Sequence, residues 1–130
     1  MAGIVFTEIE DSEQPRVNAV AMQGSTWEYV LKVVHEDTGL PFNLSGYSGR
    51  SQIRKGYGSI EVVKEWVVTM LAPPENGEIR LRLEAVDTAG IKRGRYVSDV
   101  EIYTAGDGEV KKVLQIPKLE VYPEVTKPIV

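Results

Sequence analysis

Apolar and polar residues alternate along most of the chain, and this alternation predicts strands almost throughout. The clearest period of two is GEIRLRLEA at residues 77–85, where Ile79, Leu81 and Leu83 share one face. The segment STWEYVLKVVHE at residues 25–36 alternates in the same way. Because successive side chains of a strand point to opposite faces, each segment is expected to bury one face and expose the other.

Further strands are predicted between clusters of turn residues. Gly106-Asp107-Gly108 separates two alternating runs, and Asp-Gly in such a position is a strong hairpin signal. Helical patterns are scarce, and roughly seven or eight short strands with regular turns favour a β-sandwich or a barrel. The other segments read as strands are IVFTEIE (4–10), YSGRSQIRK (47–55), EWVVTML (65–71), RYVSDVEIYT (95–104), EVKKVLQI (109–116) and the start of LEVYPEVTKPIV (119–130).

The apolar faces of these strands predict one common hydrophobic core. Trp27, Tyr29 and Trp66 have an alternative, an exposed aromatic platform that stacks on carbohydrate, but the alternation of Trp27 and Tyr29 with Leu31 favours the core. The predicted core residues are Trp27, Tyr29, Leu31, Ile53, Leu81, Leu83, Tyr96, Val100 and Leu114.

A local pattern in GIKRGRYVSDVEI, at residues 90–102, concerns one tyrosine. Gly94 stands two residues before Tyr96 at the start of a predicted strand. This spacing is typical of the tyrosine corner of Greek-key sandwiches, in which the tyrosine hydroxyl bonds to the backbone of the preceding connection. The alternative is a buried tyrosine on a strand with no such bond.

Composition narrows the class of protein. A length of 130 residues predicts one domain, and 42% hydrophobic with 26% charged residues is typical of a soluble globular protein. The net charge of −4 gives no electrostatic reason to expect nucleic acid, and the absence of cysteine excludes disulfides and thiolate metal sites. No apolar run approaches the roughly 20 residues of a membrane span, and the N-terminus has no signal-peptide pattern. We expect a protein that stays in the cytoplasm or is released by lysis.

Residues with catalytic or ligand-binding chemistry are few. His35 ends a strand, and a single histidine without cysteine cannot make a typical zinc site, so a structural or surface role is expected. KGYGS at residues 55–59 lacks the ending of a phosphate loop and reads as a hairpin loop. DTGLPFN and TAGDGE lack the ligand spacing of a calcium loop. The sequence predicts no enzyme, no catalytic or metal-binding residue, no cofactor and no small-molecule substrate.

One strand, within residues 47–55, places polar side chains on a single face. Arg50, Gln52 and Arg54 share this face, opposite Ser51 and Ile53. The favoured interpretation is a solvated face with cross-strand ion pairs. A second interpretation is that the arginines dock onto an acidic neighbouring protein, because guanidinium pairs with carboxylate in a bidentate way. A substrate-anion site is a distant third.

Five motifs follow one another between residues 24 and 126. They are GSTWEYVLKV, DTGLPFNLSGYSGRSQIR, GEIRLRL, TAGIKRGRYVSDVEI and GEVKKVLQIPKLEVYPEVT. In this order the chain resembles a family of small immunoglobulin-like structural proteins of tailed bacteriophages. It is also similar to the N-terminal β-sandwich domain of siphophage upper baseplate proteins. The chain departs from the family at Gln115-Ile116-Pro117, where the family often has a glycine.

The resemblance implies an all-β fold and a structural function. The fold expected is a single immunoglobulin-like antiparallel β-sandwich of about seven or eight strands with extended termini. It divides the chain into an N-terminal strand or arm at 1–23, the sandwich at 24–122 and an extended tail at 123–130. The function implied is a non-enzymatic virion component of the tail, baseplate or fibre attachment, assembled in the host bacterial cytoplasm. Capsid decoration and a glycan-binding adhesion module are the alternatives.

The expected partners are other virion proteins and copies of the chain itself, with no nucleic acid and no membrane. The N-terminal stretch 1–10 and the tail are the first candidates for contact, since a lone strand and a stiff proline-bearing tail can add to a neighbour. The interface candidates are Ile4, Phe6, Arg50, Gln52, Arg54, Tyr122, Pro123 and Pro128.

Overall fold

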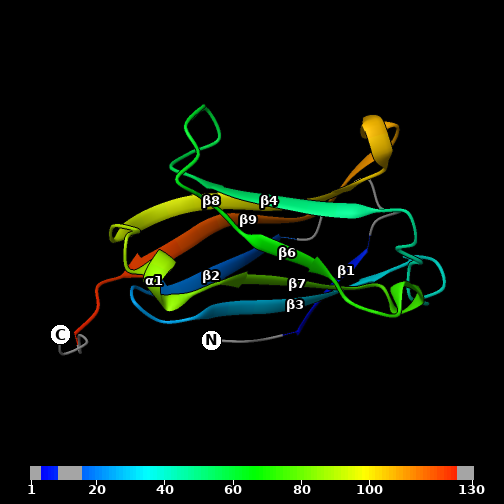
Figure 1. Cartoon of the computed structure of the whole chain (residues 1–130), viewed down its shortest axis with the longest axis horizontal. Coiled ribbons are helices and arrows are strands. Elements are labelled where there is room, and N and C mark those ends of the chain that lie inside the picture. The colour runs from blue at the N-terminus through cyan, green and yellow to red at the C-terminus, as the bar shows by residue number, and fades with distance from the viewer. Residues whose placement is uncertain (1–3, 9–15, 126–130) are drawn as a thin grey trace.

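The computed structural model of the chain describes residues 4–8 and 16–125, and it shows two β-sheets packed face to face (Figure 1). The four-stranded sheet has the order β1 (Ile4–Glu8), β3 (Trp27–Val34), β7 (Glu78–Leu83) and β6 (Val67–Met70). The five-stranded sheet has the order β2 (Arg16–Met22), β9 (Val110–Tyr122), β8 (Gly94–Tyr103), β4 (Ser48–Arg54) and β5 (Lys64–Glu65). Helical turns are short: η1 (Pro74–Asn76), α1 (Ala85–Thr88) and η2 (Ala105–Asp107). The predicted all-β sandwich is confirmed.

Two strand pairs differ from the predicted antiparallel arrangement. β1 runs parallel to β3, and β2 runs parallel to β9, whereas the other pairs are antiparallel. A parallel pair needs a crossover connection. Between β1 and β3 this crossover passes through β2 in the opposite sheet. The alternation of single segments contains no information on such a path.

The N-terminal strands β1 and β2 pair with strands of the two sheets. In the ladder between β1 and β3, Ile4 is the partner of Val30 and Phe6 is the partner of Lys32. β2 pairs with β9 along residues 16–22. In its two described stretches, the segment predicted as a strand or arm at 1–23 pairs within the chain's own sheets, and the division of the chain at residue 23 stays a prediction.

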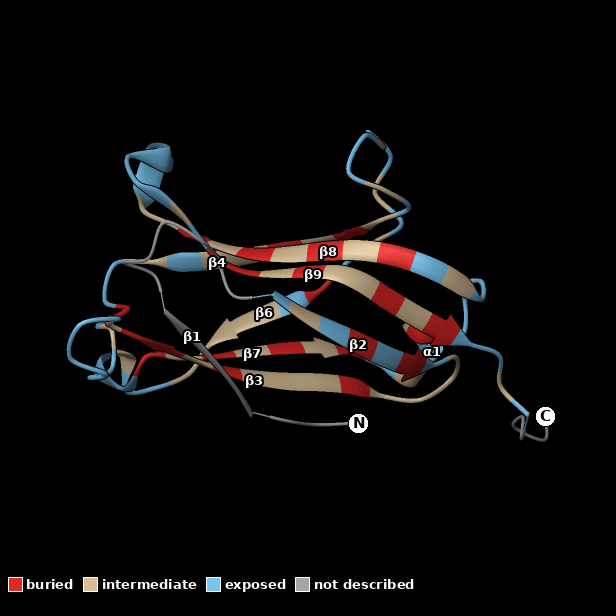
Figure 2. Cartoon of the chain, turned by 180° about the vertical axis from the view of Figure 1, so that it is seen from behind, coloured by how far each residue is buried: buried red, intermediate tan, exposed pale blue. Residues whose placement is uncertain are grey.

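The space between the sheets holds the predicted core, seen as the inward red bands of Figure 2. Eight of the nine predicted residues are buried, and Tyr29 is partly buried against them. The ring of Trp66 lies 6.0 Å from Trp27 and 5.9 Å from Tyr29 between centroids, so the carbohydrate platform is excluded and the core interpretation is confirmed. The eight are Trp27, Leu31, Ile53, Leu81, Leu83, Tyr96, Val100 and Leu114.

Trp66 lies where the chain passes from one sheet to the other. β5 ends at Glu65 in the five-stranded sheet, and β6 begins at Val67 in the four-stranded sheet. The indole Nε1 of Trp66 donates to Ser98 Oγ at 3.2 Å, and its backbone nitrogen donates to the Ser51 carbonyl at 3.0 Å. This residue closes one side of the sandwich.

The tyrosine corner is confirmed. Tyr96 is 2% exposed, and its hydroxyl donates to the Lys92 carbonyl at 2.5 Å. Lys92 belongs to the connection between α1 and β8, so the bond fixes the path by which the chain enters β8.

Pro117 sits inside β9, which is paired on both sides, and the strand adapts to it with a bulge. Tyr96 is the ladder partner of Leu119 and Ser98 is the partner of Ile116, so one residue of β8 faces two residues of β9. Proline has no N–H to donate to the ladder, and a bulge leaves one residue unpaired. The departure from the expected pattern at this point thus coincides with a shift of register in a continuous strand.

Candidate functional site

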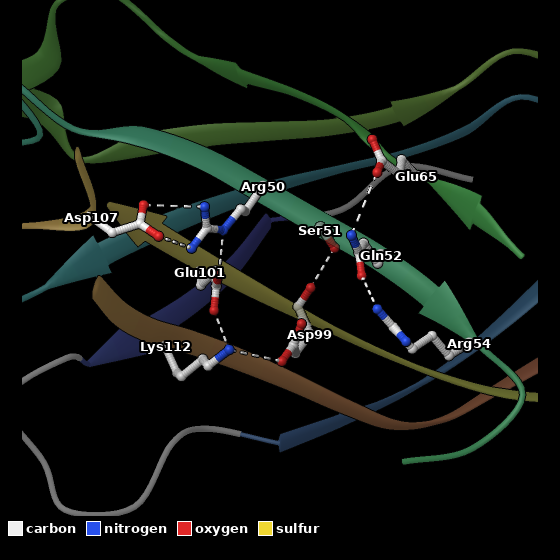
Figure 3. A network of polar contacts seen from close by, with 9 residues as sticks. All are labelled: Arg50, Ser51, Gln52, Arg54, Glu65, Asp99, Glu101, Asp107 and Lys112. Atoms are coloured by element: carbon white, nitrogen blue, oxygen red, sulfur yellow. Dashed lines mark hydrogen bonds and ion pairs between the residues drawn. The ribbon is translucent and has the colours of Figure 1, made fainter. Parts of the chain in front are cut away.

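The polar face predicted on residues 47–55 lies on the outer side of the five-stranded sheet. Alternation is obeyed along β4, because Ser51 and Ile53 are buried and the even-numbered residues point outward. The ladder places Arg50 opposite Glu101 and Gln52 opposite Asp99 on β8. Figure 3 shows the resulting polar network across β4, β8 and β9.

Arg50 is bound by groups of its own chain. Its Nε donates to Glu101, and its two terminal nitrogens lie 3.4 and 3.5 Å from the carboxylate oxygens of Asp107. The guanidinium carbon lies 4.3 Å from the centroid of the Tyr103 ring. The contacts with Glu101 and Asp107 raise the pKa of Arg50, with the hydrogen bond to Glu101 as the largest cause. The favoured interpretation of this face, cross-strand ion pairing, is confirmed for Arg50.

Lys112 of β9 completes the same network. Its Nζ contacts Glu101 and lies 3.6 Å from Asp99 Oδ2. Burial acts to raise the pKa of Glu101, but hydrogen bonds from Lys112 and Arg50 outweigh burial and lower it below its ordinary value. Glu101 therefore stays ionised and holds two cations from two neighbouring strands. The charges of this part of the face neutralise one another.

Arg54 differs from Arg50 because its hydrogen bonds go to neutral oxygens. Its Nη2 donates to Gln52 Oε1 at 2.7 Å and its Nη1 donates to the Ser59 carbonyl at 2.7 Å. Gln52 in turn lies 3.5 Å from Glu65 Oε1. Within the described residues Arg54 has no ion pair. Its positive charge is available to an incoming group.

An open hollow of about 280 Å³ follows this face of the sheet. Its floor is formed by the β4 residues and the facing part of β8, and the loop between β4 and β5 walls it with Gly56 and Tyr57. This loop contains the predicted hairpin loop at 55–59 and projects from the sandwich (Figure 1). The hollow has one cation without a carboxylate partner, Arg54, so it is a poor site for a multiply charged substrate anion.

Two buried serines lie beneath this face and were not singled out from the sequence. Ser98 Oγ donates to the Gln52 carbonyl at 2.8 Å, and Ser51 Oγ donates to the Asp99 carbonyl. Trp66 donates to Ser98, so both hydroxyls are satisfied. Neither contacts a histidine in the part of the chain that the structure describes, and we assign them a structural role. The signal for them in the sequence was their alternation with the outward-facing residues along the strands β4 and β8.

The other interface candidates lie away from this face. Tyr122 ends β9, is 45% exposed, and donates its hydroxyl to Glu120 at 2.8 Å. Pro123 follows it and is exposed, and Pro128 lies outside the described residues. Ile4 and Phe6 are placed on β1 by the ladder only. Participation of these residues in an interface stays a prediction.

His35 follows β3 and its ring centroid lies 5.1 Å from that of Phe42, which is a packing contact. Residues 4–8 and 16–125 contain no group of three or more metal-binding side chains. None of the helices in these ranges has the length and apolar character needed to cross a membrane.

The fold links this chain to a known phage domain. The chain is similar to the N-terminal domain of phage TP901-1 ORF48, with a TM-score of 0.58 and 16% sequence identity. The similarity covers 92% of this chain and 98% of that domain. No protein-family model and no curated protein matches the sequence. At this level of identity the comparison establishes a common fold, and it confirms the resemblance inferred from the five motifs at the level of structure.

Proposed function

We propose that this chain is a non-enzymatic structural component of a tailed phage virion, acting in the tail, baseplate or fibre attachment through contacts with other proteins. The observation that carries the proposal is the shared sandwich fold with a phage domain over 92% of the chain. The order of the five sequence motifs supports the same class of protein. Its partners are other virion proteins and further copies of the chain.

The polar face of the five-stranded sheet supports a protein-binding role better than a chemical one. Arg50 and Lys112 are held by Glu101, which fixes the side chains and leaves little net charge for a substrate. An interface rim built from fixed ion pairs contributes to partner choice and register. The proposed location follows from this role: the chain is assembled in the host cytoplasm and carried in the particle.

The experiment is a particle-incorporation assay. A phage lacking the gene is complemented with the tagged full chain, and density-purified particles are examined by mass spectrometry and by gold labelling in electron microscopy. The proposal expects the tag in stoichiometric amounts at the tail or its tip. Label on the head would make the chain a capsid protein, and particles complete without it would refute a structural role.

A second comparison tests the tail as the attachment element. Removal of residues 123–130 starts after the last residue of β9, so the sandwich is expected to keep its stability. We expect this truncated chain to fold and to be lost from particles. The control is the single substitution Val67→Ala, which alters an exposed side chain on β6 of the other sheet and should incorporate normally. Normal incorporation of the truncated chain would move attachment to a sheet face.

A further inference from the structure

Five cations gather at the end of the sandwich where β4 ends and β8 begins. We define this basic corner as Arg54, Lys55, Lys92, Arg93 and Arg95. They come from two segments that the fold brings together. Lys55 Nζ lies 4.7 Å from the centroid of the Tyr96 ring, and a Cβ added to Gly94 would stand 3.3 Å from the same Nζ.

The charges of the basic corner are largely uncompensated. Among residues 16–125, the first four members form no ion pair. Arg95 reaches Glu120 only at 4.0 Å, and that carboxylate also binds Lys118 at 2.8 Å. All members except Arg54 are exposed. Arg50, in contrast, is bound by two carboxylates. The uncompensated cations are the more notable because the net charge of the chain is −4.

The opposite end of the sandwich is acidic. It is formed by the connection between β3 and β4, by η1 and by the turn around η2, which lie together at the right of Figure 1. Leu44 donates its backbone N–H to the Pro74 carbonyl at 3.0 Å, which joins the connection between β3 and β4 to η1. The Tyr47 hydroxyl donates to Glu109 Oε1 at 3.4 Å, which joins the same connection to the turn around η2. The exposed carboxylates of this acidic end are Glu36, Asp37, Glu75, Asp107 and Glu109.

Two of these carboxylates form ion pairs within the chain, and two others form none in the part that the structure describes. Asp107 is bound by Arg50, and Glu109 lies 3.4 Å from Lys111. Asp37 and Glu75 form no ion pair with any residue that the structure describes. The two ends thus carry complementary unpaired charge.

We propose that copies of the chain associate head to tail, with the basic corner of one copy bound to the carboxylates of the acidic end of the next. The ten residues of β8 separate the two ends by about 30 Å, so they cannot meet within one chain. A contact between two different surfaces of identical subunits is heterologous, and it closes into a ring or extends as a filament. Arginines suit this contact because guanidinium binds carboxylate through two parallel hydrogen bonds.

The loop between β4 and β5 adds apolar area beside the basic corner. Tyr57 is 69% exposed and Ile60 is 93% exposed on this loop. Exposed ion pairs alone contribute little binding free energy, whereas an apolar core surrounded by polar groups is typical of a specific interface. The inference deepens the proposed structural role and rests on it, since only an assembling protein has use for such a contact.

The test is sedimentation velocity of the purified full chain at low and at high ionic strength. We expect oligomers at low ionic strength that dissociate when salt screens the contact. Lys92→Glu with Arg93→Glu should weaken self-association by about tenfold or more. Asp37→Lys with Glu75→Lys should do the same. An equimolar mixture of these two variants should associate again, because each reversed surface meets a reversed partner.

The control is a charge reversal away from both ends. Arg16→Glu lies at the start of β2, opposite Gln115 of β9, and should associate like the unmodified chain. Thermal unfolding by circular dichroism shows whether each variant is folded. A monomer at low ionic strength, or a corner-reversed variant that associates normally, overturns the inference. Particle incorporation is measured separately, so a monomeric chain that enters particles would refute this contact and leave the proposed function standing.

Discussion

Arg50 of β4 lies directly opposite Glu101 of β8, and its guanidinium Nε donates to the Glu101 carboxylate. The two residues are 51 positions apart in the sequence. The same carboxylate also binds Lys112 of β9, so one acidic side chain links three adjacent strands. Because of this pairing, Arg50, which could have formed part of an anion site on the outer face of β4, is instead neutralised by carboxylates of the same chain.

The first prediction measures this pair by a double-mutant cycle. Arg50→Ala and Glu101→Ala should show a coupling free energy of about 0.5–1 kcal/mol in denaturant unfolding, since the arginine side chain is 41% exposed and solvent screens the pair. Arg50→Ala with Glu84→Ala is the control, because these residues lie on different sides of the sandwich and their effects should add. A coupling of zero for Arg50 and Glu101 would mean that the ion pair contributes nothing to stability.

The second prediction concerns the pH dependence of stability. The pKa of Glu101 is lowered in the folded chain, because Lys112 and Arg50 outweigh the effect of burial. Its contribution to stability is therefore complete above its ordinary pKa and is lost as the pH falls through the lowered value. Glu101→Gln should be less stable than the unmodified chain near neutral pH, and the difference should shrink in acid.

Urea unfolding at a series of pH values makes this measurement. Glu75→Gln, which changes an exposed carboxylate without an ion pair in the described chain, should follow the unmodified protein. A gap between Glu101→Gln and the unmodified chain that widens in acid would contradict the sign of the argument.

The third prediction tests the tyrosine corner. Tyr96→Phe removes the hydroxyl that donates to the Lys92 carbonyl and should cost about 1 kcal/mol of unfolding free energy. Tyr57→Phe removes an exposed hydroxyl on a loop and should leave stability unchanged. Equal stability of Tyr96→Phe and Tyr57→Phe would show that the corner bond has no net value.

The fourth prediction concerns the core. Leu81 is fully buried on β7, so Leu81→Ala should destabilise the chain by about 2–5 kcal/mol through lost transfer free energy and the cavity left behind. Val67→Ala is the control on the same sheet, because Val67 is 61% exposed. Chemical denaturation of both variants gives the comparison, and a loss below about 0.5 kcal/mol for Leu81→Ala would refute the packing argument.

The sequence by itself determined which face of each strand is buried. The inward positions of Leu81 on β7 and Ser51 on β4 follow from a period of two, which is a property of the extended backbone and needs no neighbour. The tyrosine corner at Tyr96 was also predictable from a short stretch of sequence, since its hydroxyl bonds to a residue only four positions earlier in the chain. Gly106-Asp107-Gly108 likewise marked the turn that joins β8 and β9.

The tertiary structure alone decided which strands are neighbours and in which direction they pair. The parallel pairing of β1 with β3 and of β2 with β9 depends on how the chain crosses between the sheets, and no local pattern encodes that path. The same dependence chose Glu101 as the partner of Arg50 and left Arg54 without a carboxylate partner among the described residues. It also joined Lys55 to the segment around Arg93 in the basic corner. Periodicity is local, whereas register is set by packing between segments far apart in sequence.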